Sequence, residues 1–247
     1  DAAKWMVHEM ELDIRGMEFK VHSWNIQTRD QISGLLNNWK KELERRHIRN
    51  EVRSIVVESF GDQKRVPFEL DIPLDILAIN DIFRSGGYEL MLVGGCVRDA
   101  VMGKSPKDFD LATNAAPDRV EQLLNDHGYR TLATGKAFGV IIVITDNDQY
   151  EVATYRADIG GSDGRRPDTV EFTDMETDAK RRDLTMNALY YDISTKELID
   201  VVGGLEDIRN GVVRTVGDAD ERFKEDRLRV MRAVRFAARL GHDVDAD

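Results

Sequence analysis

The middle of the chain alternates between short apolar runs and longer stretches whose apolar residues recur at every third or fourth position. The runs 89–93 and 140–145 are aliphatic and bounded by glycine or polar residues, which is typical of buried strands. The segment 74–83 has its apolar residues at helical spacing and is followed by Gly86 and Gly87, so it predicts a helix that ends there. Helices and strands interleave along this region, which indicates an α+β fold.

Further elements follow from the same patterns. Residues 149–155 alternate between polar and apolar positions and predict a strand, and Pro117 stands at the first turn of a predicted helix. Residues 160–167 are rich in glycine and charge and predict a loop. The remaining elements expected here are helices at 97–102, 117–127 and 179–189, and strands at 108–112 and 198–202.

The last stretch, 222–240, is strongly amphipathic and predicts one continuous helix. Its core-facing side chains are expected to be Phe223, Val230, Val234 and Ala237. Basic side chains outnumber acidic ones along this stretch, so an acidic chain carries a local basic patch here. On charge alone, a solvated helix face accounts for the patch.

The first part of the chain has a different texture. It predicts a strand at 18–24, a helix at 30–47 and a strand at 51–60, the helix because its apolar residues recur at three- and four-residue steps. We find no motif in this part that indicates catalysis or ligand binding. Residues 1–72 are therefore interpreted as an accessory α/β module, which offers a surface for self-association or for a partner.

Composition limits the class of protein. The chain has 247 residues, 41% of them hydrophobic and 33% charged, which is sufficient for a buried core and one or two domains. Cys96 is the single cysteine, so an intramolecular disulfide is excluded and a reducing interior is indicated. Neither a signal-peptide pattern nor a bilayer-spanning run is found, so we expect a cytoplasmic location and no membrane partner. The net charge of −11 argues against coating nucleic acid through a broad basic surface.

Two short motifs carry candidate chemistry. Gly94 and Gly95 lie between a predicted strand and a predicted helix, where backbone N–H groups can approach a polyphosphate closely. In a strand, Asp108 and Asp110 point to one face and Phe109 to the other. Neighbouring carboxylates repel each other, and a hard cation such as Mg²⁺ relieves the repulsion. Either motif alone has an ordinary explanation, a tight turn or an acidic strand end, but together they predict a triphosphate cradle opposite a metal site.

These residues belong to a longer pattern, LVGGCVRDAVMG followed by KDFDLAT, which closely resembles motif A of bacterial and eukaryotic (class II) CCA-adding enzymes and bacterial poly(A) polymerases. Five motifs in the family's order make the resemblance specific, and it extends from about Pro73 to Gly241. The later segments that resemble family motifs are EVATYR (151–156, a catalytic-sheet strand), SDGRRP (162–167, the mobile loop), RRDLTMNAL (181–189, motif B), DVVGGLEDIRNG (200–211, the hinge) and EDRLRVMRAVRFAARLG (225–241, motif D and the start of the neck).

The resemblance implies a polymerase β-like nucleotidyltransferase head at 73–216, followed by the start of an all-α neck at 217–247. It implies template-independent addition of C and A from CTP and ATP to the 3′ end of tRNA, with release of pyrophosphate and with two Mg²⁺ ions. Related activities stay open: an enzyme that adds A alone or CC alone, or a poly(A) polymerase acting on another RNA. A non-catalytic nucleotide-binding or structural protein is the alternative from a different class.

The resemblance also implies roles for individual residues. Those expected to act at the reaction centre are Asp108 and Asp110 as metal ligands and catalytic residues, with Glu151 as a third catalytic acid. Those expected to bind the nucleotide are Gly94, Gly95 and Arg98 at the triphosphate, Arg182, Asp183 and Asn187 at the ribose, and Asp226 and Arg229 at the base, with Glu225, Arg232 and Arg235 in support.

Most of these residues also have a structural interpretation. Arg98 can pair with Asp99 to brace its loop, and Glu151 can be a strand-edge charge. Lys136, in the hairpin-like rim 134–139, is a candidate phosphate contact or a solvated turn lysine. Arg165 and Arg166 lie on the expected mobile loop, where the resemblance places control of nucleotide choice.

Overall fold

The computed structural model describes residues 13–14, 17–18, 65–160 and 168–245. The chain divides into two units, Asp1–Ile48 and Arg49–Asp247. In the first unit, β1 (Asp13–Ile14) pairs antiparallel with β2 (Met17–Glu18). Beyond Glu18, the N-terminal elements expected from the sequence at 18–24, 30–47 and 51–60 lie outside the described residues.

Within the described part of the second unit, an eight-stranded mixed sheet has the order β3-β12-β11-β4-β5-β8-β7-β6. Only the β5–β8 pair among these neighbours is parallel; the other adjacent strands are antiparallel. Interleaved helices and strands confirm the expected α+β class. The strands are β3 (Arg65–Pro67), β4 (Leu90–Val93), β5 (Asp110–Thr113), β6 (Arg130–Gly135), β7 (Val140–Ile144), β8 (Gln149–Thr154), β11 (Leu189–Asp192) and β12 (Glu197–Asp200).

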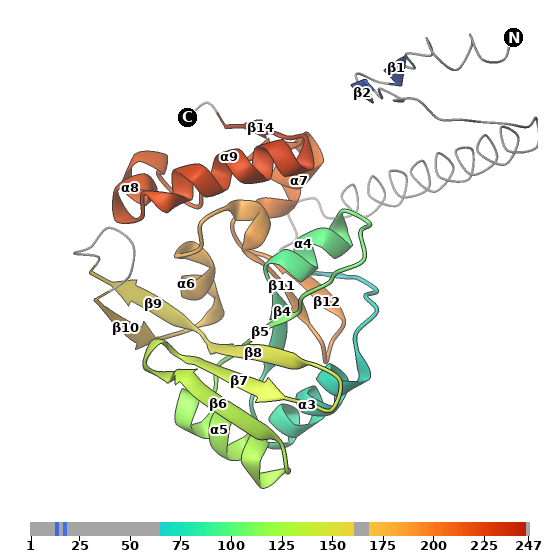
Figure 1. Ribbon diagram of the computed structural model, residues 1–247, viewed down its shortest axis with the longest axis vertical. Helices are drawn as coiled ribbons and strands as arrows, with labels where there is room; N and C mark the ends of the chain where they lie inside the picture. The colour runs from blue at the N-terminus through green and yellow to red at the C-terminus, as the bar shows by residue number, and fades with distance from the viewer. Residues whose placement is uncertain (1–12, 15–16, 19–64, 161–167, 246–247) are drawn as a thin grey trace, which may run out of the picture. The chain divides into compact units, whose positions relative to one another are not determined.

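The two faces of this sheet are covered differently. The larger apolar core lies on one face, where α3 (Leu74–Ser85), α4 (Gly95–Val101) and α5 (Pro117–Asp126) supply buried side chains; α5 lies behind β6 and β7 (Figure 1). A smaller core under α6 (Met175–Lys180) occupies part of the other face. On that second face Asp110 of β5 and Glu151 of the adjacent strand β8 are exposed to solvent, and the candidate site forms there.

Two hairpins border this open face. The first joins β6 to β7 through a short turn at Lys136–Phe138, as expected for the rim at 134–139. The second pairs β9 (Arg156–Ile159) with β10 (Thr169–Phe172). Most of the expected loop at 160–167, including Arg165 and Arg166, lies outside the described residues.

The expected helix at 179–189 is wrong. α6 ends at Lys180, a single 3-10 turn covers Thr185–Asn187, and β11 begins at Leu189. The backbone of this segment is bound by tertiary partners: Leu184 bridges to Thr215, and the Thr185 N–H donates to the Arg214 carbonyl at 3.0 Å. Apolar spacing cannot reveal such partners, because they come from a distant part of the chain.

The expected single helix at 222–240 is also wrong. α8 (Ala219–Glu225) and α9 (Leu228–Leu240) are separated by Asp226, whose backbone is extended with φ −144° and ψ 105°. The Asp226 carboxylate accepts a hydrogen bond from the Leu228 N–H at 2.9 Å, as a helix-starting aspartate does. The hydrogen bond from the backbone to this carboxylate therefore interrupts the helix, although the apolar spacing on both sides of it is helical.

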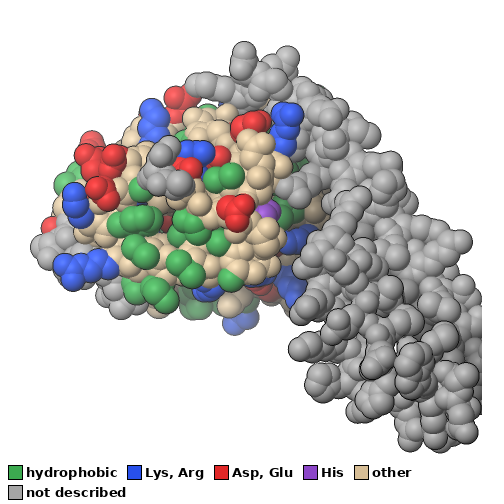
Figure 2. All heavy atoms as spheres, turned by 90° about the horizontal axis from the view of Figure 1, so that it is seen from above, with side chains coloured by type: hydrophobic (Ala, Val, Ile, Leu, Met, Phe, Trp, Pro, Cys, Tyr) green, Lys and Arg blue, Asp and Glu red, His purple; other side chains and the backbone are tan. Residues whose placement is uncertain are grey.

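The buried side of α9 differs from the expected one. Ala233 and Phe236 are buried, whereas Val230 is 41% exposed and Val234 is 54% exposed. Figure 2, which views the molecule from the side of α8 and α9, shows hydrophobic side chains gathered on this surface. The expected face is wrong for Val230 and Val234 and confirmed for Ala237, which is half-buried against the larger core.

The head sheet begins earlier in the chain than the boundary expected at 72. Val66 of β3 pairs with Leu198 of β12 and is buried in the larger core.

At the other end of the chain, β13 (Val212–Val213) pairs parallel with β14 (Asp243–Val244). No helix within the described residues is both long enough and apolar enough to cross a bilayer.

Cys96 lies in the larger core, at the second position of α4. Its thiol donates to the Val93 carbonyl at 3.3 Å. Burial raises the pKa of this thiol to about 11. Cys96 is thus a packing residue in the folded chain.

Candidate functional site

Three acidic residues come together at the open face of the sheet. Leu111 and Val152 are register partners on the parallel strands β5 and β8, and both are fully buried. Because side chains alternate along a strand, the preceding residues Asp110 and Glu151 both face the other side. Asp108, expected to be the first residue of this strand, precedes β5, yet it lines the same groove as Asp110 and Glu151.

The electrostatics of the groove fit a cation. Burial raises the pKa of Asp110, the Arg182 guanidinium opposes that rise, and the Asp108 carboxylate adds to it. No set of three or more His, Cys, Asp or Glu side chains within the described ranges is arranged to hold a metal by itself. Two carboxylates fit Mg²⁺, which usually completes its shell with water and substrate phosphate oxygens.

The glycine pair lies beside these carboxylates. Val93, the residue before Gly94, is the register partner of Asp110 on the adjacent strand. Gly94 has φ +77°, a conformation that L side chains rarely adopt, and α4 starts at Gly95. At this helix start, no side chain among the described residues forms an N-cap hydrogen bond. The Gly94 N–H donates to the Leu189 carbonyl at 3.1 Å. The backbone N–H groups that this turn offers beside the acidic groove, as a phosphate site requires, therefore start at Gly95.

A second Val-Gly-Gly turn shows what such a turn binds. It precedes α7 (Gly204–Asn210), and Gly203 also has a positive φ. Here one carboxylate, that of Asp200, accepts hydrogen bonds of 2.9–3.1 Å from four successive backbone N–H groups, those of residues 202–205. Three residues before Gly94 stands Met91, which is buried and has no such acceptor. The first turn thus has no carboxylate at the place of Asp200, and its Gly94 N–H donates to the Leu189 carbonyl instead.

Arg98 is held by protein groups. It is 4% exposed, it donates to the Asp99 carboxylate at 2.7 and 2.9 Å, and its Nη1 donates to the Asn187 side-chain oxygen at 2.5 Å. Its guanidinium carbon also lies 5.0 Å from the ring centroid of Phe236 on α9. The brace with Asp99 is confirmed, and Arg98 further connects α4 with the segment around Asn187.

The three residues expected at the ribose are brought together without the helix that was expected to carry them. Asn187 donates to the Asp183 carboxylate at 3.4 Å, and Asp183 accepts from Arg232 at 2.6 Å. Arg182 approaches the glycine turn, since a Cβ built on Gly94 would lie 3.8 Å from its Nη1. Arg182 and Asn187 therefore both lie beside the phosphate turn, since the same Cβ would lie 3.6 Å from the Asn187 carbonyl oxygen, and Asp183 lies toward α9.

The residues expected to read the base flank the joint between α8 and α9. Asp226 and Arg229 do not share one helix, because α8 ends before Asp226. Glu225 accepts from Arg229 at 3.0 Å, which confirms the expected orienting contact. Arg229 also donates to the Arg181 carbonyl at 3.3 Å, and the Arg235 guanidinium carbon lies 5.2 Å from the centroid of the Phe236 ring.

Lys136 is engaged at the rim. Its ammonium lies 2.6 Å from carboxylate oxygens of both Asp118 and Glu121 on α5. These acids raise the pKa of Lys136 through hydrogen bonds to its ammonium. The structure therefore favours a role in holding the rim to α5.

Two residues near the site were missed in the sequence. Asp178 binds Arg182 at 2.9 Å, and the Tyr190 hydroxyl lies 2.6 Å from the same carboxylate. Asp178 and Arg182 are four residues apart, a spacing that by itself predicts an ion pair on a helix. Tyr190 gave no such signal, because it stands in an apolar strand.

Comparisons with known proteins agree with this geometry. A family profile described as the poly(A) polymerase head domain matches residues 90–214. The CCA-adding enzyme of Lactiplantibacillus plantarum is 44% identical over 169 residues, which cover 68% of this chain and 40% of that protein. The CCA-adding enzyme of Bacillus subtilis is 45% identical over 166 residues, which cover 67% of this chain and 41% of that protein.

Solved structures give the same result. A crystal structure of the Bacillus stearothermophilus CCA-adding enzyme in complex with CTP matches with a TM-score of 0.63 and 38% identity, over 72% of this chain and 42% of that one. A tRNA nucleotidyltransferase complexed with a primer tRNA and an incoming ATP analog matches with a TM-score of 0.55 and 30% identity, over 68% of this chain and 46% of that one. The chain thus spans less than half the length of these relatives.

Proposed function

Because the chain belongs to the poly(A) polymerase head-domain family, we propose that it carries the nucleotide-transfer site of a template-independent RNA nucleotidyltransferase. The proposed reaction joins the RNA 3′-oxygen to the α-phosphorus of CTP or ATP, breaks the bond to pyrophosphate and releases the hydroxyl proton. The observation that carries the proposal is the groove of Asp108, Asp110 and Glu151 beside the Gly94–Gly95 turn.

Each part of this site has a distinct task. Asp108 and Asp110 would hold Mg²⁺, which when bound lowers the pKa of the 3′-hydroxyl and neutralises charge on the leaving pyrophosphate. Glu151 faces the same side as Asp110 and is positioned to act as the third acid. The Gly94–Gly95 turn would bind the phosphates, Gly94 by allowing close approach and Gly95 through its backbone N–H, with Arg98 as a further contact or as the brace of their helix. Asp226 and Arg229, supported by Glu225, Arg232 and Arg235, would read the base.

The RNA substrate is proposed from the relatives. CCA-adding enzymes are the curated proteins named above, and one solved relative was complexed with a primer tRNA. We therefore propose tRNA lacking its terminal CCA as the acceptor. Poly(A) addition is the second candidate, because the matching family profile bears that name. A cytoplasmic location and self-association through residues 1–72 stay predictions.

A primer-extension assay tests the proposal. Purified protein is incubated with tRNA lacking CCA, or with an unstructured oligoribonucleotide, together with each NTP and Mg²⁺. We expect C, C and A to be added to the tRNA and nothing to be added to the oligoribonucleotide. Repeated A addition on either RNA would instead identify a poly(A) polymerase. If the protein neither extends an RNA nor binds CTP, the proposed function is wrong.

Sugar selection gives a separate prediction. Asp183→Ala is expected to reduce the preference for CTP over dCTP by about 10-fold or more, because a hydrogen bond to a charged acceptor contributes ~1.5–3 kcal/mol. The measurement is the ratio of kcat/KM for the two nucleotides.

Arg232→Gln is the matched control for this prediction. It breaks the 2.6 Å pair with Asp183 but leaves the carboxylate in place. The preference for the ribonucleotide is expected to survive in this variant. An unchanged ratio in Asp183→Ala would remove Asp183 from the sugar contact.

A further inference from the structure

A buried carboxylate lies directly behind Arg182. Asp178 is 1% exposed. One of its oxygens accepts from the Arg181 Nε at 2.9 Å and from the Arg156 backbone N–H at 3.1 Å. The other accepts from the Tyr190 hydroxyl at 2.6 Å and from the Arg182 Nη2 at 2.9 Å. Both carboxylate oxygens accept hydrogen bonds from protein groups, so Asp178 itself is not expected to contact a substrate.

These contacts determine the direction of the Arg182 guanidinium. Its Nε and Nη2 edge is bound, since Nε lies 3.3 Å from Asp178 and donates to the Tyr190 hydroxyl at 3.0 Å. The Tyr190 ring lies 5.2 Å from the guanidinium carbon. Among hydrogen bonds between described residues, none uses Nη1 of Arg182. That nitrogen is the one directed toward Gly94.

The charge of Arg182 reaches the reaction centre. Its Nη1 lies at the turn that follows Val93, the register partner of Asp110. A flexible side chain with a delocalised charge contributes most when its orientation is fixed before the ligand arrives. Asp178 and Tyr190 supply that fixation from the side away from the groove.

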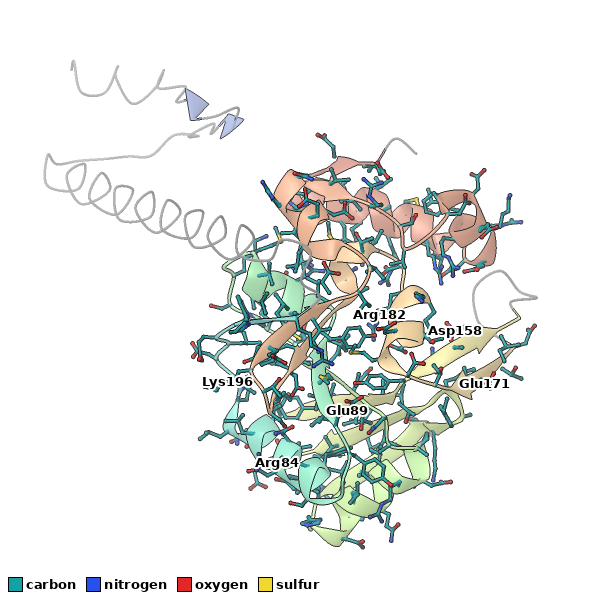
Figure 3. The ribbon with its side chains drawn as sticks, turned by 180° about the vertical axis from the view of Figure 1, so that it is seen from behind. Arg84, Glu89, Asp158, Glu171, Arg182 and Lys196 are labelled. Carbon is teal, nitrogen blue, oxygen red and sulfur yellow. The ribbon has the colours of Figure 1, made fainter. Side chains whose placement is uncertain are left out.

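Arg182 depends on Asp178 more than its neighbour does. Arg181 has a second carboxylate partner, Asp158 of β9, at 3.4 Å. For Arg182, Asp178 is the carboxylate partner within the described part of the chain. Figure 3 labels Arg182 beside α6, and Asp158 on the neighbouring hairpin. Removing the Asp178 charge is therefore expected to release mainly Arg182.

We propose that Asp178, together with Tyr190, is a positioning residue that directs Nη1 of Arg182 at the phosphates of a nucleotide bound at the Gly94–Gly95 turn. The inference rests on the proposed function, because it takes a nucleoside triphosphate as the ligand. It assigns Arg182 to the phosphates, whereas the resemblance placed this residue at the ribose.

Calorimetric titration of the chain with CTP and with CMP, both with Mg²⁺, tests this. Asp178→Asn is expected to weaken CTP binding by about 10–100-fold, as loss of a supporting contact does at other sites. CMP lacks the β- and γ-phosphates, so its affinity is expected to change much less. Asp178→Glu keeps the charge and is expected to recover part of the loss. Tyr190→Phe removes one hydroxyl and is expected to shift the CTP-to-CMP affinity ratio in the same direction.

Asp207→Asn is the matched control, because Asp207 is also a buried aspartate paired with an arginine, Arg214 at 3.1 Å. It is expected to lower the Tm but leave the affinity ratio unchanged. Wild-type affinity ratios in Asp178→Asn and Tyr190→Phe would overturn the positioning role. If Asp178→Asn does not fold, Tyr190→Phe decides by the same ratio. Absence of CTP binding by the wild-type chain would contradict the proposed function, and this inference with it.

Discussion

Asp110→Asn is expected to reduce the rate of nucleotide addition about 10³-fold or more. A bound metal ion contributes several kcal/mol of transition-state stabilisation, and each ~1.4 kcal/mol is a factor of ten in rate. The amide cannot replace the carboxylate as an anionic ligand beside Asp108. The measurement is single-turnover primer extension at saturating Mg²⁺. Asp126→Asn is the matched control, since Asp126 ends α5 on the opposite face of the sheet.

The same substitution is expected to raise the stability of the metal-free chain, or leave it unchanged. The folded-state pKa of Asp110 lies above its ordinary value of 3.8, chiefly because of burial. Such a carboxyl favours folding when it is protonated, and that contribution is lost as the pH rises through the folded-state pKa. Ionised Asp110 therefore costs stability at pH 7. Thermal unfolding in EDTA at pH 7 checks this, and a clearly lower Tm for Asp110→Asn would contradict the assigned electrostatics.

Gly204→Ala is expected to destabilise the head by about 3 kcal/mol, which for a domain of this size lowers the Tm by ~6–12 °C. A Cβ on Gly204 would overlap the carbonyl oxygen of Thr185 and lie 2.7 Å from its carbonyl carbon. Both atoms are backbone atoms, so a side-chain rotation cannot relieve the clash. Either α7 or the Thr185–Asn187 turn must shift. Calorimetry or denaturant unfolding measures the effect.

Gly95→Ala is the matched control, because Gly95 is also the first residue of a helix that follows a Val-Gly pair. A Cβ there would meet Arg98 Nη2 at 3.7 Å, an ordinary contact. Its stability is expected to stay within ~0.5 kcal/mol of wild type, as for substitutions without a clash. Equal losses of stability in the two variants would show that the Thr185 contact is not what excludes a side chain at Gly204.

The sequence predicted best the elements whose pattern is local. α3, α5, β7 and β8 have strong periodicity and clear breakers such as Gly86 and Pro117, and they lie close to their expected places. The opposition of Phe109 to Asp110 was also predictable, because alternation is a property of any strand. The match of motif order to a known family supplied the function, which periodicity alone does not contain.

What failed was set by contacts between distant segments. Residues 181–188 have helical spacing but are held by the backbone around Arg214 and Thr215, and no local rule reports such a partner. Asp226 ends one helix and starts another because its carboxylate binds the backbone ahead of it. The support of Arg182 by Tyr190 brings β11 against the end of α6, a packing result that neither segment predicts by itself.

The burial of Cys96 has a practical consequence. With a thiol pKa of about 11, only about one molecule in ten thousand carries a thiolate at pH 7, so maleimides and iodoacetamide should react with it extremely slowly. The chain has no other cysteine. A cysteine introduced at an exposed site, for example by Glu171→Cys on β10, would therefore accept a fluorophore at one defined place without prior removal of the native thiol. Fluorescence from that strand can then be followed while CTP is titrated, with Cys96 left unchanged.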